Sequence, residues 1–441
     1  MNGFGLHKQK LHRLSACVAS VLFLSATGAL ADDWPQWRGL DRDGVWHETG
    51  IIESFAGPQL DAEWTAEISN GYSGPTVAEG RVYVTDRVVD PVQMERVLCF
   101  DATTGERLWT HEYTCRYHRV GYPDGPRASV TIADGRAYSL GTMGHLRCLD
   151  AVSGELLWKK DPGTDYDVDR PVWGIAAAPL VEGNLVIVQL GARPDACIVA
   201  LDKETGREVW RALEDPASYS APVMIEQAGE RVLVCWTGSH IVGLNPATGE
   251  VHWQYDTPQS KMVINVPTPV IDGDRLFLSS FYDGAYMLRL HQDMLGIEKI
   301  WQRQGKSERD TDALHAMIST PLIQGDYVYG VDSYGQLRCL DGRTGDRVWE
   351  DLTAVPPDRW ATIHMVRNGD RIWMFNDRGE LIISTLSPDG FNEISRTKLI
   401  EPTKGQLSRG DGVAWSHPAF ANKHIFIRSD TQLVCANLAA Q

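Results

Sequence analysis

One spacing pattern recurs along this chain and strongly limits what it can fold into. An aspartate is followed four residues later by a glycine and eight residues later by a tryptophan. Where copies are adjacent, they lie about 43 to 52 residues apart, a period typical of propellers and other repeat arrays. Four copies are complete and a fifth begins with asparagine: Asp101-Gly105-Trp109, Asp150-Gly154-Trp158, Asp202-Gly206-Trp210, Asp341-Gly345-Trp349 and Asn245-Gly249-Trp253.

Residue chemistry predicts that each copy is a tight turn followed by a strand. Aspartate can accept hydrogen bonds from the backbone just after it, and glycine adopts the positive φ that closes such a turn. The tryptophan then leaves its strand on a fixed face, where it can pack against the neighbouring unit. We therefore expect seven tryptophans to be structural docking residues: Trp64, Trp109, Trp158, Trp210, Trp253, Trp301 and Trp349.

The repeats predict an all-β fold. Eight units can be counted, and most begin with a small residue and a proline, such as Gly74-Pro75 or Ala178-Pro179. Two units have lost part of the pattern: His291 replaces the aspartate in the fifth, and Ser395 stands in place of the tryptophan in the seventh. Alternating apolar residues between turn residues indicate strands throughout.

The two ends of the repeat array complete each other. Trp64 has the character of an outer-strand tryptophan with no unit before it, whereas the last unit stops near Asn437, where its own outer strand should begin. Joining them closes a ring and removes exposed sheet edges. We predict an eight-bladed β-propeller of four-stranded antiparallel blades, closed by the N-terminal strand around Trp64, which joins the C-terminal blade.

The first 31 residues have the features of a cleaved export signal. Lys8, Lys10 and Arg13 precede an apolar run, and Ala29-Leu30-Ala31 fits a cleavage site. The stretch Leu14–Cys17 matches a lipoprotein box, but it precedes the apolar run, so we expect no lipid anchor. The expected organisation is a signal peptide at 1–31, an N-terminal segment at 32–57 and the propeller at 58–441, in a bacterial periplasmic or secreted protein.

Composition restricts the partners. The formal net charge is −16, and removing the basic signal makes the remaining chain more acidic still. Such a charge argues against binding to nucleic acid. Outside the signal, no apolar stretch approaches the roughly 20 residues of a membrane span. We expect a monomer.

The cysteine pattern gives no support for a metal centre or a disulfide framework. Seven cysteines follow the signal, and four of them occupy equivalent positions in different units, which lie apart in space. No Cys-x-x-Cys, Cys-His cluster or adjacent cysteine pair occurs. We expect free, buried cysteines and no metal site.

The repeat resembles a known family. Leu-Asp-x-x-Thr-Gly-x-x-x-Trp is similar to the tryptophan-docking motif of the pyrroloquinoline quinone (PQQ) repeat, and it covers nearly all of the chain after the signal. Trp34-Pro35-Gln36-Trp37-Arg38-Gly39 resembles the opening of secreted bacterial PQQ-like propellers of unassigned role. The resemblance implies the propeller fold but little about function, since the family contains both dehydrogenases and cofactor-free scaffolds, including the outer-membrane assembly propellers.

Residues just ahead of each innermost strand should converge on the central funnel of the propeller. Aromatic rings with a few polar groups there could stack a planar quinone or a sugar ring. Alternatively, the tryptophans plug the funnel, the arginines pair with acids such as Asp124, and the histidines only hold loops. The candidate cofactor-binding or ligand residues are Tyr72, His118, Arg119, Arg127, Trp173, Tyr219, Asn265, His315, Trp360, Trp415 and His417.

Two functions are consistent with the sequence. The favoured one is a non-catalytic binding or scaffold module for protein, peptide or glycan, acting through the funnel or one face, with no cofactor and no catalytic residue. The alternative is a quinoprotein alcohol or sugar dehydrogenase using PQQ and calcium. Resemblance to those enzymes implies a calcium-binding carboxylate and asparagine, a general-base aspartate and a vicinal disulfide, and the adjacent cysteines are missing here.

Overall fold

The computed structural model of this protein describes residues 1–3, 5, 32–407 and 410–440. The chain divides into two units, Met1–Leu30 and Ala31–Gln441, and every described strand belongs to the second unit. Almost all of the predicted export signal, including its lipoprotein-box-like cysteine Cys17, lies outside the described residues. No described helix is long and apolar enough to cross a membrane.

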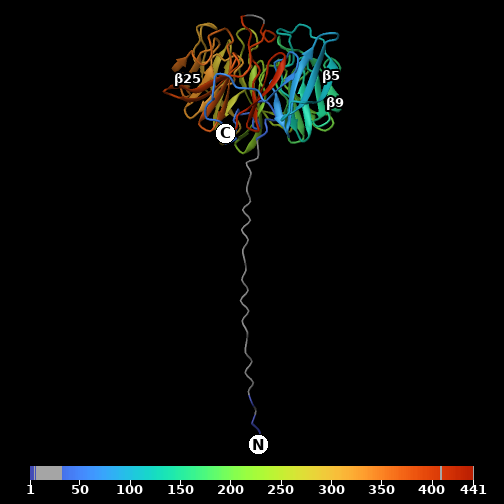
Figure 1. Ribbon diagram of the computed structural model, residues 1–441. Coiled ribbons are helices and arrows are strands. Elements are labelled where there is room, and N and C mark those ends of the chain that lie inside the picture. The colour runs from blue at the N-terminus through green and yellow to red at the C-terminus, as the bar shows by residue number, and fades with distance from the viewer. Residues whose placement is uncertain (4, 6–31, 408–409, 441) are drawn as a thin grey trace. The chain divides into compact units, whose positions relative to one another are not determined.

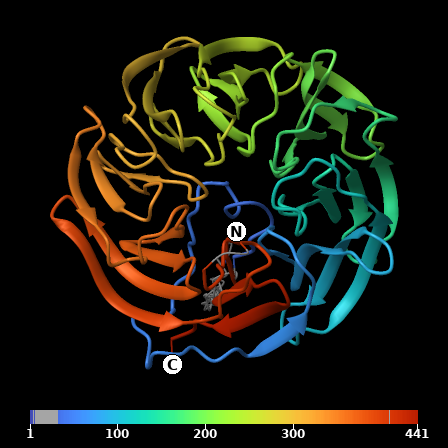
Figure 2. The same cartoon turned by 90° about the horizontal axis from the view of Figure 1, so that it is seen from above.

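Eight antiparallel sheets form a ring, so the prediction of an all-β, eight-bladed propeller is confirmed (Figures 1 and 2). Within a blade, consecutive strands pair with each other because tight turns join them. The first four blades consist of β2 (Thr76–Ala78), β3 (Arg81–Val88), β4 (Met94–Asp101) and β5 (Arg107–Thr114); β6 (Thr131–Ala133), β7 (Arg136–Leu140), β8 (Leu146–Asp150) and β9 (Leu156–Lys160); β10 (Asp167–Val168), β11 (Leu180–Glu182), β12 (Leu185–Arg193), β13 (Ala196–Asp202) and β14 (Glu208–Ala212); and β15 (Val223–Gln227), β16 (Glu230–Trp236), β17 (His240–Leu244) and β18 (Val251–Asp256).

The third blade is the exception to four strands, because β10 and β11 both pair with β12. The other four blades consist of β19 (Val270–Asp272), β20 (Arg275–Ser280), β21 (Gly284–Leu290) and β22 (Ile297–Arg303); β23 (Leu322–Gln324), β24 (Tyr327–Val331), β25 (Leu337–Asp341) and β26 (Arg347–Asp351); β27 (Ile363–Asn368), β28 (Arg371–Asn376), β29 (Glu380–Ser387) and β30 (Gly390–Lys398); and β31 (Ala419–Ala421), β32 (His424–Arg428) and β33 (Gln432–Asn437) with β1 (Trp64–Glu67).

The ring closes through β1, which is the outer strand of the last blade. β1 pairs antiparallel with β33, and Trp64 lies opposite Cys435. The Trp64 ring packs against the first blade: its Nε1 donates to the Ala102 carbonyl at 3.0 Å. A Cβ atom on Gly105, whose φ is +71°, would lie only 2.6 Å from that ring, so glycine is required by both conformation and packing.

The same contact repeats between successive blades. Trp109 donates to the Ala151 carbonyl, and Trp158 donates to the Lys203 carbonyl, one residue after the aspartate of the next unit. Trp253 differs because His291 replaces that aspartate. Its Nε1 donates instead to Gln227 Oε1, and Gln227 Nε2 donates to the His291 carbonyl. A glutamine side chain therefore bridges a junction where the turn has changed.

The N-terminal segment, residues 32–57, is packed into the propeller and crosses the middle of the ring (blue in Figure 2). Trp34 pairs with Val77 of the first blade, and Trp46 is 1% exposed against Trp373 and Phe420. In the seventh blade, Ser395 occupies the tryptophan position. Its Oγ accepts a hydrogen bond from the Phe55 amide, so the segment covers that junction.

Arg42 anchors this segment in the ring. Its buried guanidinium donates to the Pro222 carbonyl at 3.1 Å and to the carbonyl of Pro179, both directly ahead of innermost strands. Gln36 Oε1 accepts a further hydrogen bond from its Nε. Burial lowers the pKa of Arg42 to about 9. The guanidinium therefore satisfies carbonyl oxygens from two blades at once.

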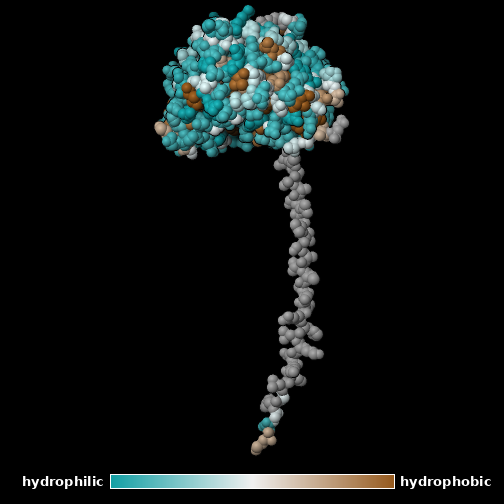
Figure 3. Space-filling view, turned by 90° about the vertical axis from the view of Figure 1, so that its left-hand side faces the viewer, coloured by the Kyte–Doolittle hydropathy of each residue, from teal (hydrophilic) through white to brown (hydrophobic). Residues whose placement is uncertain are grey.

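The seven cysteines among the described residues are buried, as the sequence predicts, and none of them forms a disulfide. The side of the propeller seen in Figure 3 is mostly hydrophilic, with small separate apolar spots. Exposed apolar residues such as Val209 and Val348 stand singly on outer strands, which is normal for a protein surface.

Candidate functional site

A cavity of about 150 Å³ lies on the axis of the ring, and every blade contributes to its wall. The blade residues come from the segments directly ahead of the innermost strands or from the beginning of such a strand. The N-terminal segment contributes one further residue. Lining residues are Trp37, Tyr72, Tyr122, Arg127, Trp173, Ala176, Ala178, Tyr219, Ala221, Val266, Met317, Ile318, Trp360, His364, Trp415 and His417. We call this space the aromatic cavity.

Tyr122 stands among the tryptophans of the aromatic cavity. Its ring centroid lies 6.1 Å from that of Trp173, 5.8 Å from that of Trp360 and 6.3 Å from that of Trp415. These are edge-on arrangements, which the charge distribution of aromatic rings favours. Trp173 also lies against Tyr219, with centroids 5.1 Å apart. The wall is therefore a set of interlocked rings.

Arg127 holds the loop that carries Tyr122. Its guanidinium donates to the Gly125 carbonyl at 2.6 Å, to the Gly121 carbonyl at 2.9 Å and to the Tyr122 carbonyl. It also lies 4.7 Å from the centre of the Tyr72 ring. Burial lowers its pKa. The expected alternative partner, Asp124, accepts hydrogen bonds from Asn70 and Tyr72, so Arg127 positions the loop through backbone carbonyls.

The two histidines of the aromatic cavity are engaged and neutral. His364 Nε2 lies 2.8 Å from the Trp415 carbonyl, and His417 Nε2 lies 2.7 Å from Ser129 Oγ. Burial lowers the pKa of His364 to about 4 and that of His417 to about 3. The Trp37 and His417 rings pack in an edge-to-face arrangement, and Trp37 Nε1 donates to Thr268 Oγ1 at 2.7 Å.

Acidification should destabilise the protein through His364. Its folded-state pKa lies below the ordinary 6.5, so below that pH the unfolded chain takes up a proton that the folded chain refuses. Stability is therefore fully present above pH 6.5 and is lost as the pH falls toward 4. We expect a loss of about 2 kcal/mol between pH 8 and pH 5 from this group alone. Urea unfolding at pH 8 and at pH 5 measures this loss of stability. The His364→Gln variant should lose less stability between the two pH values. If its stability depends on pH as that of wild type does, His364 is not the group responsible.

Seven of the eleven candidate residues meet in the aromatic cavity, and four lie elsewhere. His118 and Arg119 are exposed, and His118 contacts the Arg170 guanidinium. Asn265 is fully buried and donates to the Thr237 carbonyl. His315 is also buried, where it contacts the Phe281 carbonyl and accepts from the Gly305 amide. These latter two side chains hold loops together.

Nine lining residues were not among the candidates, and three of these have aromatic rings. Trp37 belongs to the N-terminal segment, so the repeat register gave no place for it. Tyr122 lies inside a long loop, at φ +53°, and that backbone turn directs it to the axis. His364 is the second residue of β27, whereas the candidates were sought just ahead of each innermost strand. Its proximity to Trp360 is the signal that could have identified it.

The aromatic cavity does not have the donor set that calcium and PQQ chemistry needs. Calcium takes six to eight oxygen ligands, several from carboxylates. Among the described residues lining the cavity, none is an aspartate or glutamate, and the charged side chain is the cation Arg127. Asn265 is not among these lining residues: its Nδ2 donates to the Thr237 carbonyl, and its Oδ1 is buried without a described partner. These residues do not fit a calcium–quinone centre or a carboxylate general base.

The sequence also matches a known family. Residues 93–351, more than half of the chain, match the family described as outer membrane protein assembly factor BamB. The chain belongs to this family of PQQ-like β-propellers. A solved structure of BamB from Moraxella catarrhalis has a TM-score of 0.59 at 16% identity, and the alignment covers 86% of this chain and 99% of that one. This likeness concerns the fold.

Curated relatives divide between two kinds of protein. The quinohemoprotein alcohol dehydrogenase ADH-IIG of Pseudomonas putida is 28% identical over 306 residues, 60% of this chain and 41% of that enzyme. Outer membrane protein assembly factor BamB of Burkholderia pseudomallei (strain K96243) is 24% identical over 56% of this chain and 65% of its own length. The matches thus span less than two thirds of either relative.

Proposed function

We propose that this protein is an exported, monomeric, non-catalytic propeller that binds a protein or peptide partner by taking an apolar side chain into the aromatic cavity. The observation that carries this proposal is the wall itself: interlocked aromatic rings, two neutral histidines and no carboxylate among the described lining residues. A cavity of about 150 Å³ holds one six-membered ring. The assembly-factor relatives support a protein partner.

A side chain suits the cavity better than a sugar. Sugar hydroxyls need hydrogen-bond partners, and most polar atoms of the wall are already engaged. Arg127 binds carbonyls, Tyr72 is bonded to Asp124 and the Gln406 carbonyl, and both histidines are paired. Trp415 Nε1 is buried without a described partner and could receive one carbonyl or hydroxyl. An apolar side-chain ring, unlike a sugar, needs few hydrogen-bond partners, so this single donor is sufficient.

A binding experiment with small probes tests the proposal. In ligand-observed saturation-transfer NMR, N-acetyl-phenylalaninamide should bind and methyl glucoside should not. Trp173→Ala and Trp415→Ala should weaken probe binding at least tenfold, because each removes one face of the cavity. Val209→Ala, on an exposed outer strand, is the matched control and should bind as wild type does.

Other outcomes would replace the proposal. Binding of methyl glucoside but not the amide would indicate a glycan module. No binding of either probe, or equal binding by the tryptophan variants, would show that the aromatic cavity is a packed plug. Circular dichroism of each variant separates loss of the site from loss of the fold.

A further inference from the structure

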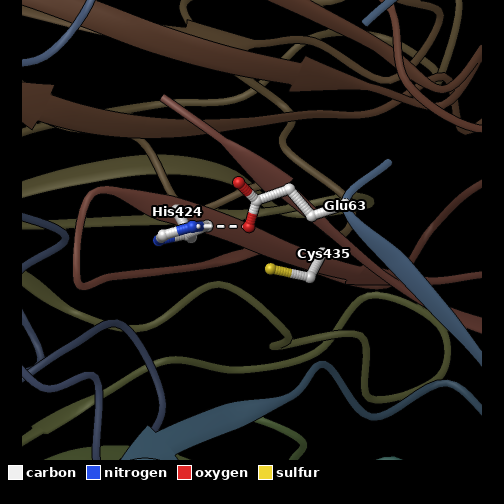
Figure 4. Close-up of side chains that lie close together, drawn as sticks. All are labelled: Glu63, His424 and Cys435. Atoms are coloured by element: carbon white, nitrogen blue, oxygen red, sulfur yellow. Dashed lines mark hydrogen bonds and ion pairs between the residues drawn. The ribbon is translucent and has the colours of Figure 1, made fainter. Parts of the chain in front are cut away.

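Three side chains of the kinds that bind zinc meet where the ring closes. Glu63 directly precedes β1, His424 begins β32, and Cys435 lies in β33. One donor atom from each lies within 4.8 Å of the other two, and Figure 4 shows the three side chains pointing toward one another. Carboxylate, imidazole and thiolate are the zinc ligands of proteins.

Cys435 differs from the cysteines at the same position in other blades. In the first, second and sixth blades the cysteine lies opposite a tyrosine, whose hydroxyl is beside the thiol. In the last blade Phe426 stands opposite Cys435 and offers no hydroxyl. The Glu63 carboxylate is the charged group near this thiol instead. The pairs in the other blades are Tyr83–Cys99, Tyr138–Cys148 and Tyr329–Cys339.

The hydrogen bonds of His424 fix its tautomer. Nδ1 lies 2.5 Å from the Asn422 carbonyl, which can only accept, so Nδ1 carries a proton. Nε2 lies 2.9 Å from Glu63 Oε2, which when ionised also only accepts. Nε2 and the Glu63 carboxylate are therefore the ring and acid atoms that face each other, and both are atoms that bind zinc in proteins. A backbone carbonyl on the far nitrogen is the usual outer contact of a metal-binding histidine.

We propose that Glu63, His424 and Cys435 bind one zinc ion, with water as the fourth ligand. Tetrahedral zinc places its donor atoms about 3.5 Å apart, so His424 Nε2 and Glu63 Oε2, now 2.9 Å apart, separate slightly, while the thiol, within 4.8 Å of both side chains, moves closer. The Cys435 thiol releases its proton to solvent as the Zn–S bond forms. The ion ties together β32, β33 and the residue that leads into β1. The ring closure is thereby held by a metal in addition to Trp64.

Cobalt titration tests this site, because a thiolate ligand gives Co(II) an intense sulfur-to-metal absorption band. The purified, metal-stripped protein should develop this band with one equivalent of Co(II) and lose it when Zn(II) is added. Cys435→Ala should abolish the band. Cys99→Ala, at the same register in the first blade, is the matched control and should keep it. Zinc should also raise the melting temperature of wild type but not of Cys435→Ala.

Two further variants keep the test decisive. His424 is partly exposed, so the His424→Gln variant should fold even if Cys435→Ala is unstable. It should bind cobalt at least tenfold more weakly than wild type. Cys115→Ala addresses the group Glu95, Cys115 and His145, which also lies within 4.8 Å. Loss of the band in Cys115→Ala with retention in Cys435→Ala would overturn the proposal. The absence of any band in wild type at saturating cobalt would overturn the proposal and leave a hydrogen-bonded histidine–glutamate pair.

Discussion

Replacing Trp64 with alanine is expected to lower the free energy of unfolding by about 3–5 kcal/mol, the usual cost of removing a buried aromatic ring. The ring is 9% exposed, donates to the Ala102 carbonyl and covers Gly105. It stands where the first and last parts of the chain meet. Its loss should therefore loosen β1 first, and hydrogen exchange should show faster exchange of the β1 and β33 amides.

Urea unfolding measures the size of this effect. Val209→Ala is a suitable control, because Val209 is 49% exposed on β14, and it should change stability by no more than about 0.5 kcal/mol. If Trp64→Ala unfolds at the same urea concentration as wild type, then closure through β1 contributes little to the ring.

Trp46→Ala is expected to cost a similar amount, about 3–5 kcal/mol. Trp46 belongs to the N-terminal segment, yet its ring is 1% exposed and lies 5.4 Å from Trp373 and 5.0 Å from Phe420. Its Nε1 donates to Glu48 Oε2, which also accepts from the Lys423 amide. The segment and the last two blades thus share one core.

Urea unfolding of Trp46→Ala distinguishes an integral segment from a separate one. Leu40→Ala is the control in the same segment, since Leu40 is 61% exposed, and it should be nearly neutral. A single cooperative transition at lower urea is the expected result for Trp46→Ala. A wild-type transition in the variant would show that residues 32–57 can detach without cost.

The docking register was predictable because it depends on local chemistry. Aspartate and glycine define the turn, and an even spacing fixes the face on which tryptophan leaves. The contact of Trp253 was not predictable, because His291 had replaced the aspartate. Gln227, which bridges that junction, has no distinctive place in the repeat. Likewise, nothing in the spacing connects Phe55 with Ser395, which are 340 residues apart.

The aromatic cavity was partly predictable for the same reason. Position ahead of an innermost strand identified Tyr72, Trp173, Tyr219 and Trp415, because the ring brings those positions to the axis. The position in the repeat does not determine where a side chain points. His315 occupies such a position, but its side chain contacts the Gly305 amide and the Phe281 carbonyl instead of lining the cavity. Trp37 reaches the cavity from outside the repeats. Long-range packing of this kind leaves no local signal.

We propose that this propeller binds a partner side chain in a cavity whose lining residues do not fit quinone chemistry. Titration of the purified protein with PQQ and calcium, following quinone absorbance and melting temperature, tests this most directly. A ligand that binds only the folded state must raise its stability. We predict an unchanged quinone spectrum and an unchanged melting temperature at high cofactor concentration. A spectral shift with a raised melting temperature, lost in Trp173→Ala, would show that the cavity binds the quinone and would place the protein among the quinoprotein dehydrogenases.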